Sequence, residues 1–242
     1  MQEYKHRPRQ KRLKEIIIGQ GIVVLLIVAV SLSLVFWGLG YKINWKNLTI
    51  KHTGIIYLSY TPKDAKVFIN DTEYKQSSPL DVQEYAGRYN LVIKKEGFSD
   101  WTQSAKVEND RVVSFKNIVL FRTAPEISEI TDQDSKNSID APYDTLVTNP
   151  NGDLVASDYE IWNGNDLVTR LASPIFGVIW YPGNEYIAFQ QGNEIRIIAK
   201  NGTNDNLLVK LNSPSKVKFI FSWDGSLLLY RDGDKYYKAN IN

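Results

Sequence analysis

The chain has 242 residues, enough for one or two domains and a tail. Its 29 Lys and Arg residues nearly balance 27 Asp and Glu residues, which argues against a dedicated nucleic-acid-binding protein with its strong basic excess. Because cysteine is absent, disulfides, cysteine-based zinc sites and thiol nucleophiles are excluded. The two histidines, His6 and His52, lie outside the predicted globular regions, so we expect no histidine-based metal site and no cofactor.

An uncharged apolar run at residues 16–41 predicts a transmembrane helix. As a helix it would be about 39 Å long at about 1.5 Å per residue, which exceeds the roughly 30 Å of a bilayer core. The run is also longer than the apolar part of a cleavable signal peptide, so we predict an uncleaved signal anchor. Aromatic residues at its far end are typical of interfacial anchors: Trp37, Tyr41 and Trp45.

The flanking charges predict the orientation of this helix. Six basic residues precede it: Lys5, Arg7, Arg9, Lys11, Arg12 and Lys14. Three follow it closely: Lys42, Lys46 and Lys51. Because basic flanks stay in the cytosol, we predict that residues 1–15 form a cytosolic basic tail of a single-pass protein in the cytoplasmic membrane, with its bulk extracytoplasmic.

Residues 53–122 predict a small β-sandwich. Apolar and β-branched runs read as short strands at residues 54–60, 66–70, 89–94 and 111–121. Turn residues separate these runs, and short strands at such spacing are typical of two packed sheets.

Four short motifs follow one another in this region: Pro62-Lys63-Asp64-Ala65, Ser78-Pro79-Leu80, Gly87-Arg88-Tyr89 and Lys95-Glu96-Gly97-Phe98. In this order they resemble the signature of the PEGA domain, whose first motif has Gly where this chain has Asp64. The resemblance implies an extracytoplasmic module for surface binding or spacing, without catalysis. The matching residues would be structural, with turns at the prolines and glycines and with Phe98 turned onto the core: Pro62, Ala65, Pro79, Gly87, Tyr89, Gly97 and Phe98.

Residues 123–142 are polar and contain Pro125 and Pro142, which predicts a linker. Asp132 and Asp134 have the spacing of a calcium loop, but Lys136 takes the next alternate position. A solvated linker therefore explains this segment better than a metal site does.

Residues 143–242 contain a repeat. Residues 180–189 align with residues 221–230 at an offset of 41 residues, and 148–157 are an earlier copy. Each copy is an apolar strand, a turn and another strand, and a period near 40 residues is typical of β-propeller blades. The region resembles TolB-type and WD-repeat propellers, most closely at Ser222-Trp223-Asp224-Gly225.

About three such blades cannot close a ring, since propellers use four to eight. The region would then be a short propeller fragment, or sheets stacked on the first domain, or half of a ring closed by self-association. In each case we expect tryptophans in or near the blades as buried anchors: Trp162, Trp180 and Trp223.

The sequence thus predicts a mainly β protein: one transmembrane helix, a small PEGA-like β-sandwich and propeller-like blades. No glycine-rich phosphate loop and no Gly-x-Ser-x-Gly elbow occurs. We therefore expect a non-catalytic binding or scaffold protein of the cell envelope, whose partners are the membrane and other envelope proteins or glycans. Two alternatives stay open: an accessory or sensory subunit of a membrane complex, and a hydrolase that uses paired carboxylates.

Overall fold

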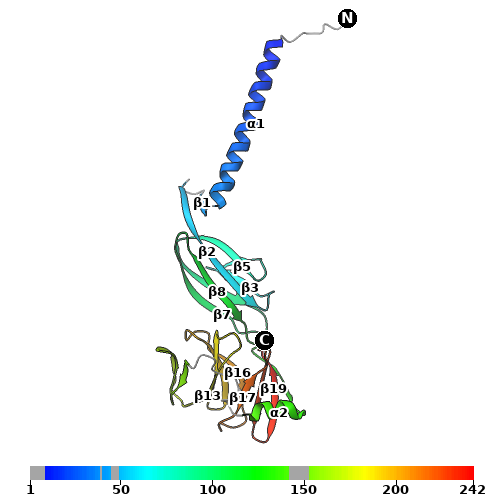
Figure 1. Cartoon of the computed structure of the whole chain (residues 1–242), viewed down its shortest axis with the longest axis vertical. Coiled ribbons are helices and arrows are strands. Elements are labelled where there is room, and N and C mark those ends of the chain that lie inside the picture. Colours follow the sequence, from blue (N-terminus) through cyan, green and yellow to red (C-terminus); the bar gives the residue numbers. More distant parts are fainter. Residues whose placement is uncertain (1–8, 39, 45–48, 142–152) are drawn as a thin grey trace. The chain divides into compact units, whose positions relative to one another are not determined.

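A computed structural model describes residues 9–38, 40–44, 49–141 and 153–242 (Figure 1). The chain is mainly β, with one N-terminal helix and several small antiparallel sheets. It divides into two compact units. The first comprises Met1–Ile55, Gln83–Gly87 and Val107–Val112, and the second comprises Ile56–Val82, Arg88–Lys106 and Val113–Asn242.

The first unit contains the predicted apolar helix, α1 (Arg9–Gly38). Its stretch Ile16–Gly38 spans 23 residues, is long and apolar enough to cross a membrane, and exposes its side chains along its whole length. Such a helix is typical of signal anchors and signal sequences. Beyond it, β1 (Tyr41–Asn44) pairs antiparallel with the start of β2 (Thr49–Thr61), from Tyr41 opposite His52 to Asn44 opposite Thr49.

Seven strands lie between residues 49 and 119, and the four predicted strands are confirmed among them. Those beyond β2 are β3 (Lys66–Ile69), β4 (Thr72–Tyr74), β5 (Leu80–Tyr85), β6 (Gly87–Lys94), β7 (Trp101–Val107) and β8 (Val112–Val119). One sheet has the order β1-β2-β5, with β8 also paired to β2, and the other has the order β4-β3-β6-β7. Buried and open positions alternate along β7, where Trp101, Ala105 and Val107 are buried, as expected for a sheet with one face in a core.

The C-terminal part forms three further antiparallel sheets. Its strands are β9 (Glu126–Glu129), β10 (Leu154–Ala156), β11 (Glu160–Asn163), β12 (Asp166–Arg170), β13 (Ile175–Trp180), β14 (Tyr186–Gln191), β15 (Glu194–Ala199), β16 (Asn206–Lys210), β17 (Phe219–Phe221), β18 (Leu227–Asp232) and β19 (Lys235–Asn240). The sheet orders are β10-β11-β12, β13-β14-β15-β16 and β17-β18-β19-β9.

The two aligned repeat copies form equivalent hairpins, β13–β14 and β17–β18. Gly192 and Gly233 occupy the turns that follow these hairpins, with positive φ values of 56° and 65°. The strand–turn–strand part of the prediction is therefore confirmed. The propeller part of the prediction is not confirmed, because no propeller is detected in the part of the chain that the structure describes. The same hairpin pattern occurs in any antiparallel meander, so it does not specify a closed ring of blades. The earlier repeat copy, at 148–157, lies partly outside the described residues.

Residues 123–142 are more than a linker. They contain β9 and the helix α2 (Gln133–Asp140). The polar strand β9 completes the last sheet by pairing with β19, from Tyr237 opposite Glu129 to Asn240 opposite Glu126. Asp132 caps α2, since its carboxylate accepts a 2.8 Å hydrogen bond from the backbone N–H of Ser135. Asp132 thus has a capping role that composition alone did not reveal, and Asp134 lies in the first turn of the helix.

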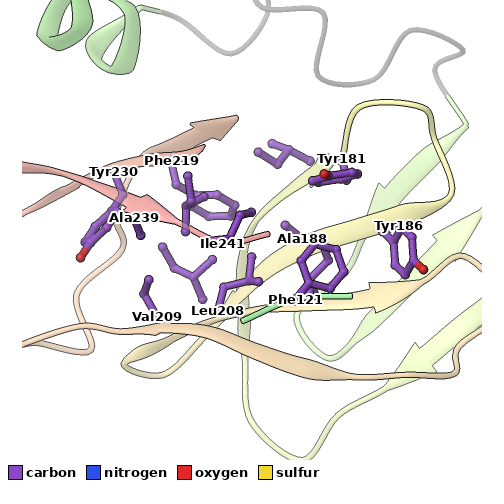
Figure 2. Close-up of a cluster of buried hydrophobic side chains, with 14 of the residues drawn as sticks. Phe121, Tyr181, Tyr186, Ala188, Leu208, Val209, Phe219, Tyr230, Ala239 and Ile241 are labelled. Carbon is purple, nitrogen blue, oxygen red and sulfur yellow. The ribbon is translucent and has the colours of Figure 1, made fainter. Parts of the chain in front are cut away.

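A large buried cluster of the second unit joins two sheets of the C-terminal part, β13-β14-β15-β16 and β17-β18-β19-β9 (Figure 2). Phe121, just beyond β8, takes part in it, and its ring centroid lies 5.5 Å from that of Tyr181 and 5.2 Å from that of Tyr186. Both ring pairs are edge-to-face, an arrangement that aromatic quadrupoles favour. One residue at the end of the 53–122 region is therefore part of the C-terminal core.

The three predicted tryptophan anchors differ in burial. Trp180 is buried, and it packs in a second cluster with Ile187 and Phe189. Trp162 is only half-buried. Trp223 is 98% exposed, so its prediction as a buried anchor is wrong. The reason is local: Trp223 lies in the turn between β17 and β18, and turns present their side chains to solvent.

Candidate functional site

The first PEGA-like motif forms the turn between β2 and β3. The carbonyl of Pro62 accepts a 3.2 Å hydrogen bond from the backbone N–H of Ala65, which is buried where the chain enters β3. Pro62 and Pro79 both follow cis peptide bonds. Gly97 has a φ of 79°, in the left-handed region where glycine is favoured, and makes the turn that precedes Phe98.

The later signature residues lie at the surface or near it. Gly87 is exposed at the start of β6, and Tyr89 is half-buried along it. Phe98 is also half-buried, which corrects the expectation that it turns onto the core. Its ring instead makes cation–π contacts with two basic side chains. Lys95 Nζ lies 5.4 Å from the ring centroid, and the Arg122 guanidinium lies 5.1 Å from it.

The predicted interfacial aromatics lie at the end of α1. Trp37 is 65% exposed. Tyr41 packs against Phe36 and against His52, whose ring centroid is 3.9 Å away. Trp45 lies outside the described residues. The role of Trp37 and Tyr41 as interfacial anchors stays a prediction.

A cleft of about 360 Å³ in the second unit carries the most varied chemistry. We call it the β7–β8 cleft after the strands that contribute half of its lining: Trp101, Gln103, Ser114, Phe115, Lys116, Ile118, Glu185, Tyr186, Ala199, Lys200, Asn201 and Thr203. Trp101 and Phe115 form an edge-to-face pair, 5.5 Å between centroids, on its apolar side. Tyr186 is a buried residue of the lining, and its burial raises the pKa of its phenol. Its hydroxyl accepts a 3.0 Å hydrogen bond from the backbone N–H of Val119.

On the polar side of the cleft, Thr203 Oγ1 is bonded tightly to Asn201 Oδ1 at 2.7 Å, whereas the contacts of Gln103 are long. The Gln103 Oε1 atom accepts hydrogen bonds from Asn201 Nδ2 and Thr203 Oγ1, both at 3.3 Å. Lys200 and Glu185 form an ion pair at 2.9 Å. The side chain of Lys116 forms no hydrogen bond or ion pair with any residue that the structure describes. Sequence reasoning missed this group, because its members are spread over a hundred residues and none belongs to a motif.

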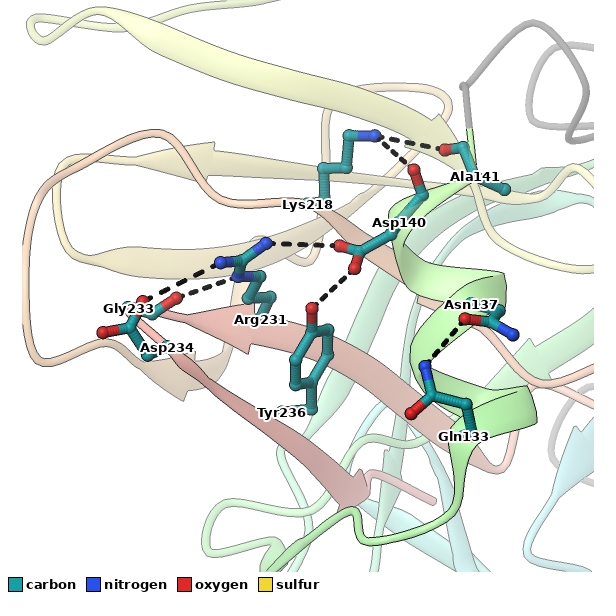
Figure 3. Close-up of polar contacts among 9 residues, drawn as sticks. All are labelled: Gln133, Asn137, Asp140, Ala141, Lys218, Arg231, Gly233, Asp234 and Tyr236. Atoms are coloured by element: carbon teal, nitrogen blue, oxygen red, sulfur yellow. Dashed lines mark hydrogen bonds and ion pairs between the residues drawn. The ribbon is translucent and has the colours of Figure 1, made fainter.

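A second polar cluster surrounds the end of α2 (Figure 3). The Asp140 carboxylate accepts a 2.5 Å hydrogen bond from the Tyr236 hydroxyl and pairs with Arg231 at 3.5 Å. This hydrogen bond raises the pKa of Tyr236. Lys218 donates to the backbone carbonyls of Asp140 and Ala141 at 2.8 and 3.3 Å. Since these groups satisfy one another and the C-terminal carbonyls of the helix, the cluster fastens α2 to its sheet.

A larger cavity of about 740 Å³ lies beside this cluster, along residues 212–218. Two buried polar residues hold that loop. Asp232 accepts 2.8 Å bonds from both the backbone N–H and the side-chain amide of Asn212. Gln190 donates to the carbonyls of Gly192 and Ser215 and accepts from the N–H of Val217. These buried groups therefore have a structural role, which is to hold the loop.

No group of three or more His, Asp or Glu side chains that could hold a metal ion is found among the described residues. Residues 53–120 match the PEGA domain family. A comparison with curated proteins found no match.

Proposed function

We propose that this protein is a non-catalytic, membrane-anchored binding or scaffold protein, which displays its β domains on the outer face of the cytoplasmic membrane. One observation supports this above the others: an exposed apolar helix, Ile16–Gly38, precedes a PEGA domain at residues 53–120 in the sequence. An exposed apolar stretch of 23 residues is costly in water and stable in a bilayer. The domain that follows then operates beside the membrane.

The orientation follows from the excess of basic residues before the helix. Residues 1–15 remain in the cytosol, and the chain after about Tyr41 is extracytoplasmic. The β domains would there meet other envelope proteins or glycans. A binding role suits the β7–β8 cleft, where aromatic and polar groups line one hollow, as they do in small-molecule sites.

Protease added to intact spheroplasts tests the orientation. We expect the full-length chain to lose everything after about Tyr41, while an epitope on the N-terminal tail survives. Protection of the β domains would contradict the proposal. In a variant with neutral residues at Lys5, Arg7, Arg9, Lys11, Arg12 and Lys14, the orientation should become mixed or inverted, because the basic residues that follow the helix then outnumber those that precede it.

Affinity capture of the full-length chain from detergent-solubilised membranes then tests the class of function. Recovery of envelope proteins or glycans supports a scaffold. Stoichiometric recovery with one membrane complex indicates an accessory subunit instead. Hydrolysis of an envelope polymer by the purified chain would contradict the non-catalytic assignment.

A further inference from the structure

The β7–β8 cleft has the size of a small-ligand site. Its volume of about 360 Å³ lies within the roughly 300–1,000 Å³ that is usual for such sites. Its two sides differ in chemistry: aromatic rings lie on one, and amide, hydroxyl and charged groups lie on the other. A ligand that fits must therefore have an apolar face and a polar edge.

The apolar side holds an aromatic ring in a fixed position. Phe115 is half-buried, and Trp101, only 6% exposed, supports it edge-to-face at an interplanar angle of 69°. The face of an aromatic ring is electronegative, so it attracts the slightly positive C–H bonds of a saturated ring. The face of a pyranose sugar presents such C–H bonds and lacks outward hydroxyls.

On the polar side, the amide of Gln103 is the group whose hydrogen bonds are most easily exchanged, whereas Thr203 Oγ1 and Asn201 Oδ1 are held together at 2.7 Å. The bonds of Gln103 to Asn201 and Thr203 are 3.3 Å long, and the bond from its Nε2 to the carbonyl of Ser104 is 3.5 Å long. These lengths lie at or beyond the upper end of the usual range, so their replacement by ligand hydroxyls costs little. Amide groups suit hydroxyl ligands because they both donate and accept.

The charge of the lining favours an anionic ligand. Lys116 and Lys200 against Glu185 leave one net positive charge. Glu185 already pairs with Lys200 at 2.9 Å. Lys116 is exposed and has no ion pair within the described part of the chain, so its ammonium group is available to a carboxylate.

From these observations we infer that the β7–β8 cleft binds an acidic oligosaccharide: one pyranose ring packs on Phe115, its hydroxyls bond to Gln103 and to the Asn201 Nδ2 atom, and the carboxylate of a neighbouring sugar pairs with Lys116. Because Phe115 and Lys116 are consecutive in β8, their side chains leave the strand on opposite faces, and only an oligomer reaches both. The inference rests on the proposed function, since a displayed β domain would meet envelope glycans. It makes the ligand of this cleft an oligomer of uronic acids or a similar carboxylated sugar.

Isothermal titration calorimetry of the full-length chain in nanodiscs tests this, with trigalacturonic acid as the probe and maltotriose as the neutral sugar. We expect trigalacturonic acid to bind and maltotriose to bind at least about fivefold more weakly, since only the former can pair with Lys116. Lys116→Gln should weaken the binding of the acidic sugar about fivefold and leave that of maltotriose unchanged. Lys210→Gln, which removes an exposed charge on β16 outside the cleft, should change neither.

A second pair of variants tests the aromatic face. Phe115→Leu retains an apolar side chain beneath Trp101 but removes the ring, and it should weaken both sugars about tenfold. Phe176→Leu alters a half-buried ring on β13 outside the cleft and should have no effect. Absence of binding at millimolar sugar, or binding that neither cleft variant changes, overturns the inference. Equal affinity for the two sugars overturns the inference that the cleft selects an acidic sugar. The protease experiment reports separately on the display of the domain, so the two failures are distinguishable.

Discussion

The side chain of Asn204 pairs with both backbone groups of Thr102. The N–H of Thr102 donates to Asn204 Oδ1 at 2.8 Å, and Asn204 Nδ2 donates to the carbonyl of Thr102 at 3.2 Å. Thr102 lies on β7, the last strand in its sheet order, so the amide bonds to the strand as a further strand would. Asn204 itself has a φ of 54°, in the left-handed region that asparagine tolerates better than most residues. This contact joins the loop after β15 to the PEGA domain.

Replacement of Asn204 should destabilise the fold in two separable ways. Asn204→Gly removes both hydrogen bonds but fits the backbone, and we expect a loss of about 1–3 kcal/mol in the free energy of unfolding. Asn204→Ala adds left-handed strain of about 1 kcal/mol. Thermal and urea unfolding of the full-length chain, followed by near-ultraviolet circular dichroism, measures both. Equal stability of the two variants would show that the backbone relaxes at this residue.

The sequence was informative where local chemistry decides the structure. A few neighbouring residues suffice to predict each of these features: the apolar run at 16–38, the turn at Pro62 and Ala65, and the hairpins around residues 181–185 and 222–226. The strand β9 was not predictable, because its polar residues become a strand only through pairing with β19, more than a hundred residues away.

The β7–β8 cleft was not predictable from the sequence either, because its lining residues are brought together only by tertiary contacts. Phe115 and Lys116 are ordinary strand residues until the fold places them beside Asn201 and Thr203. Burial was likewise misjudged at Phe98 and Trp223, because an aromatic side chain near a turn has no local signal that separates core from surface. Tertiary contacts, rather than composition, decide such positions.

Gly225 should be intolerant of any side chain. Its φ is 75°, and an added Cβ would overlap the phenol ring of Tyr181, which is only 4% exposed. The hydroxyl of Tyr181 also donates to the carbonyl of Gly225 at 3.2 Å, so the ring has little freedom to move away. We expect Gly225→Ala to cost about 2–4 kcal/mol, from backbone strain and overpacking together.

Gly233→Ala is the matched control for that variant. Gly233 has a similar φ of 65°, but nothing lies within 4 Å of an added Cβ. This substitution should cost only about 1 kcal/mol, the strain alone. If urea unfolding gives the same loss for both variants, the contact with Tyr181 contributes nothing and the packing of this turn is looser than described.

Truncation should affect the free energy of unfolding very differently at the exposed Trp223 and at the buried Trp180. Trp223→Ser should change the free energy of unfolding by less than about 0.5 kcal/mol, because the indole is 98% exposed. Trp180→Ala should cost about 3–5 kcal/mol, because it opens a cavity among Ile187 and Phe189. Chemical unfolding of the two variants in parallel decides this. A large loss with Trp223→Ser would mean that its indole is covered in solution.

Because of Asp224, the stability of the β17–β18 turn should depend on pH. Its Oδ1 atom accepts hydrogen bonds from the Ser222 hydroxyl at 2.6 Å, the Ser226 N–H at 3.1 Å and the Ser226 hydroxyl at 2.9 Å. The hydroxyl of Ser222 makes the largest contribution to lowering the pKa of Asp224 from 3.8 to about 2. A folded pKa below the unfolded one means that the stabilisation is complete above about pH 4 and is lost as the pH falls from about 4 to 2.

Asp224→Asn keeps the size of the side chain but removes the titrating group, so the stability of the variant should lack this acidic loss. The difference in melting temperature between the native chain and the variant should therefore shrink as the pH falls from about 4 to 2 and stay constant between about pH 5 and 7. Asp81→Asn, at an exposed carboxylate on β5, serves as the control and should leave the acidic loss in place. A difference that is the same at pH 2 and pH 6 would mean that the hydrogen bonds of the turn do not favour the ionised carboxylate. The contribution of Asp224 would then be independent of its ionisation.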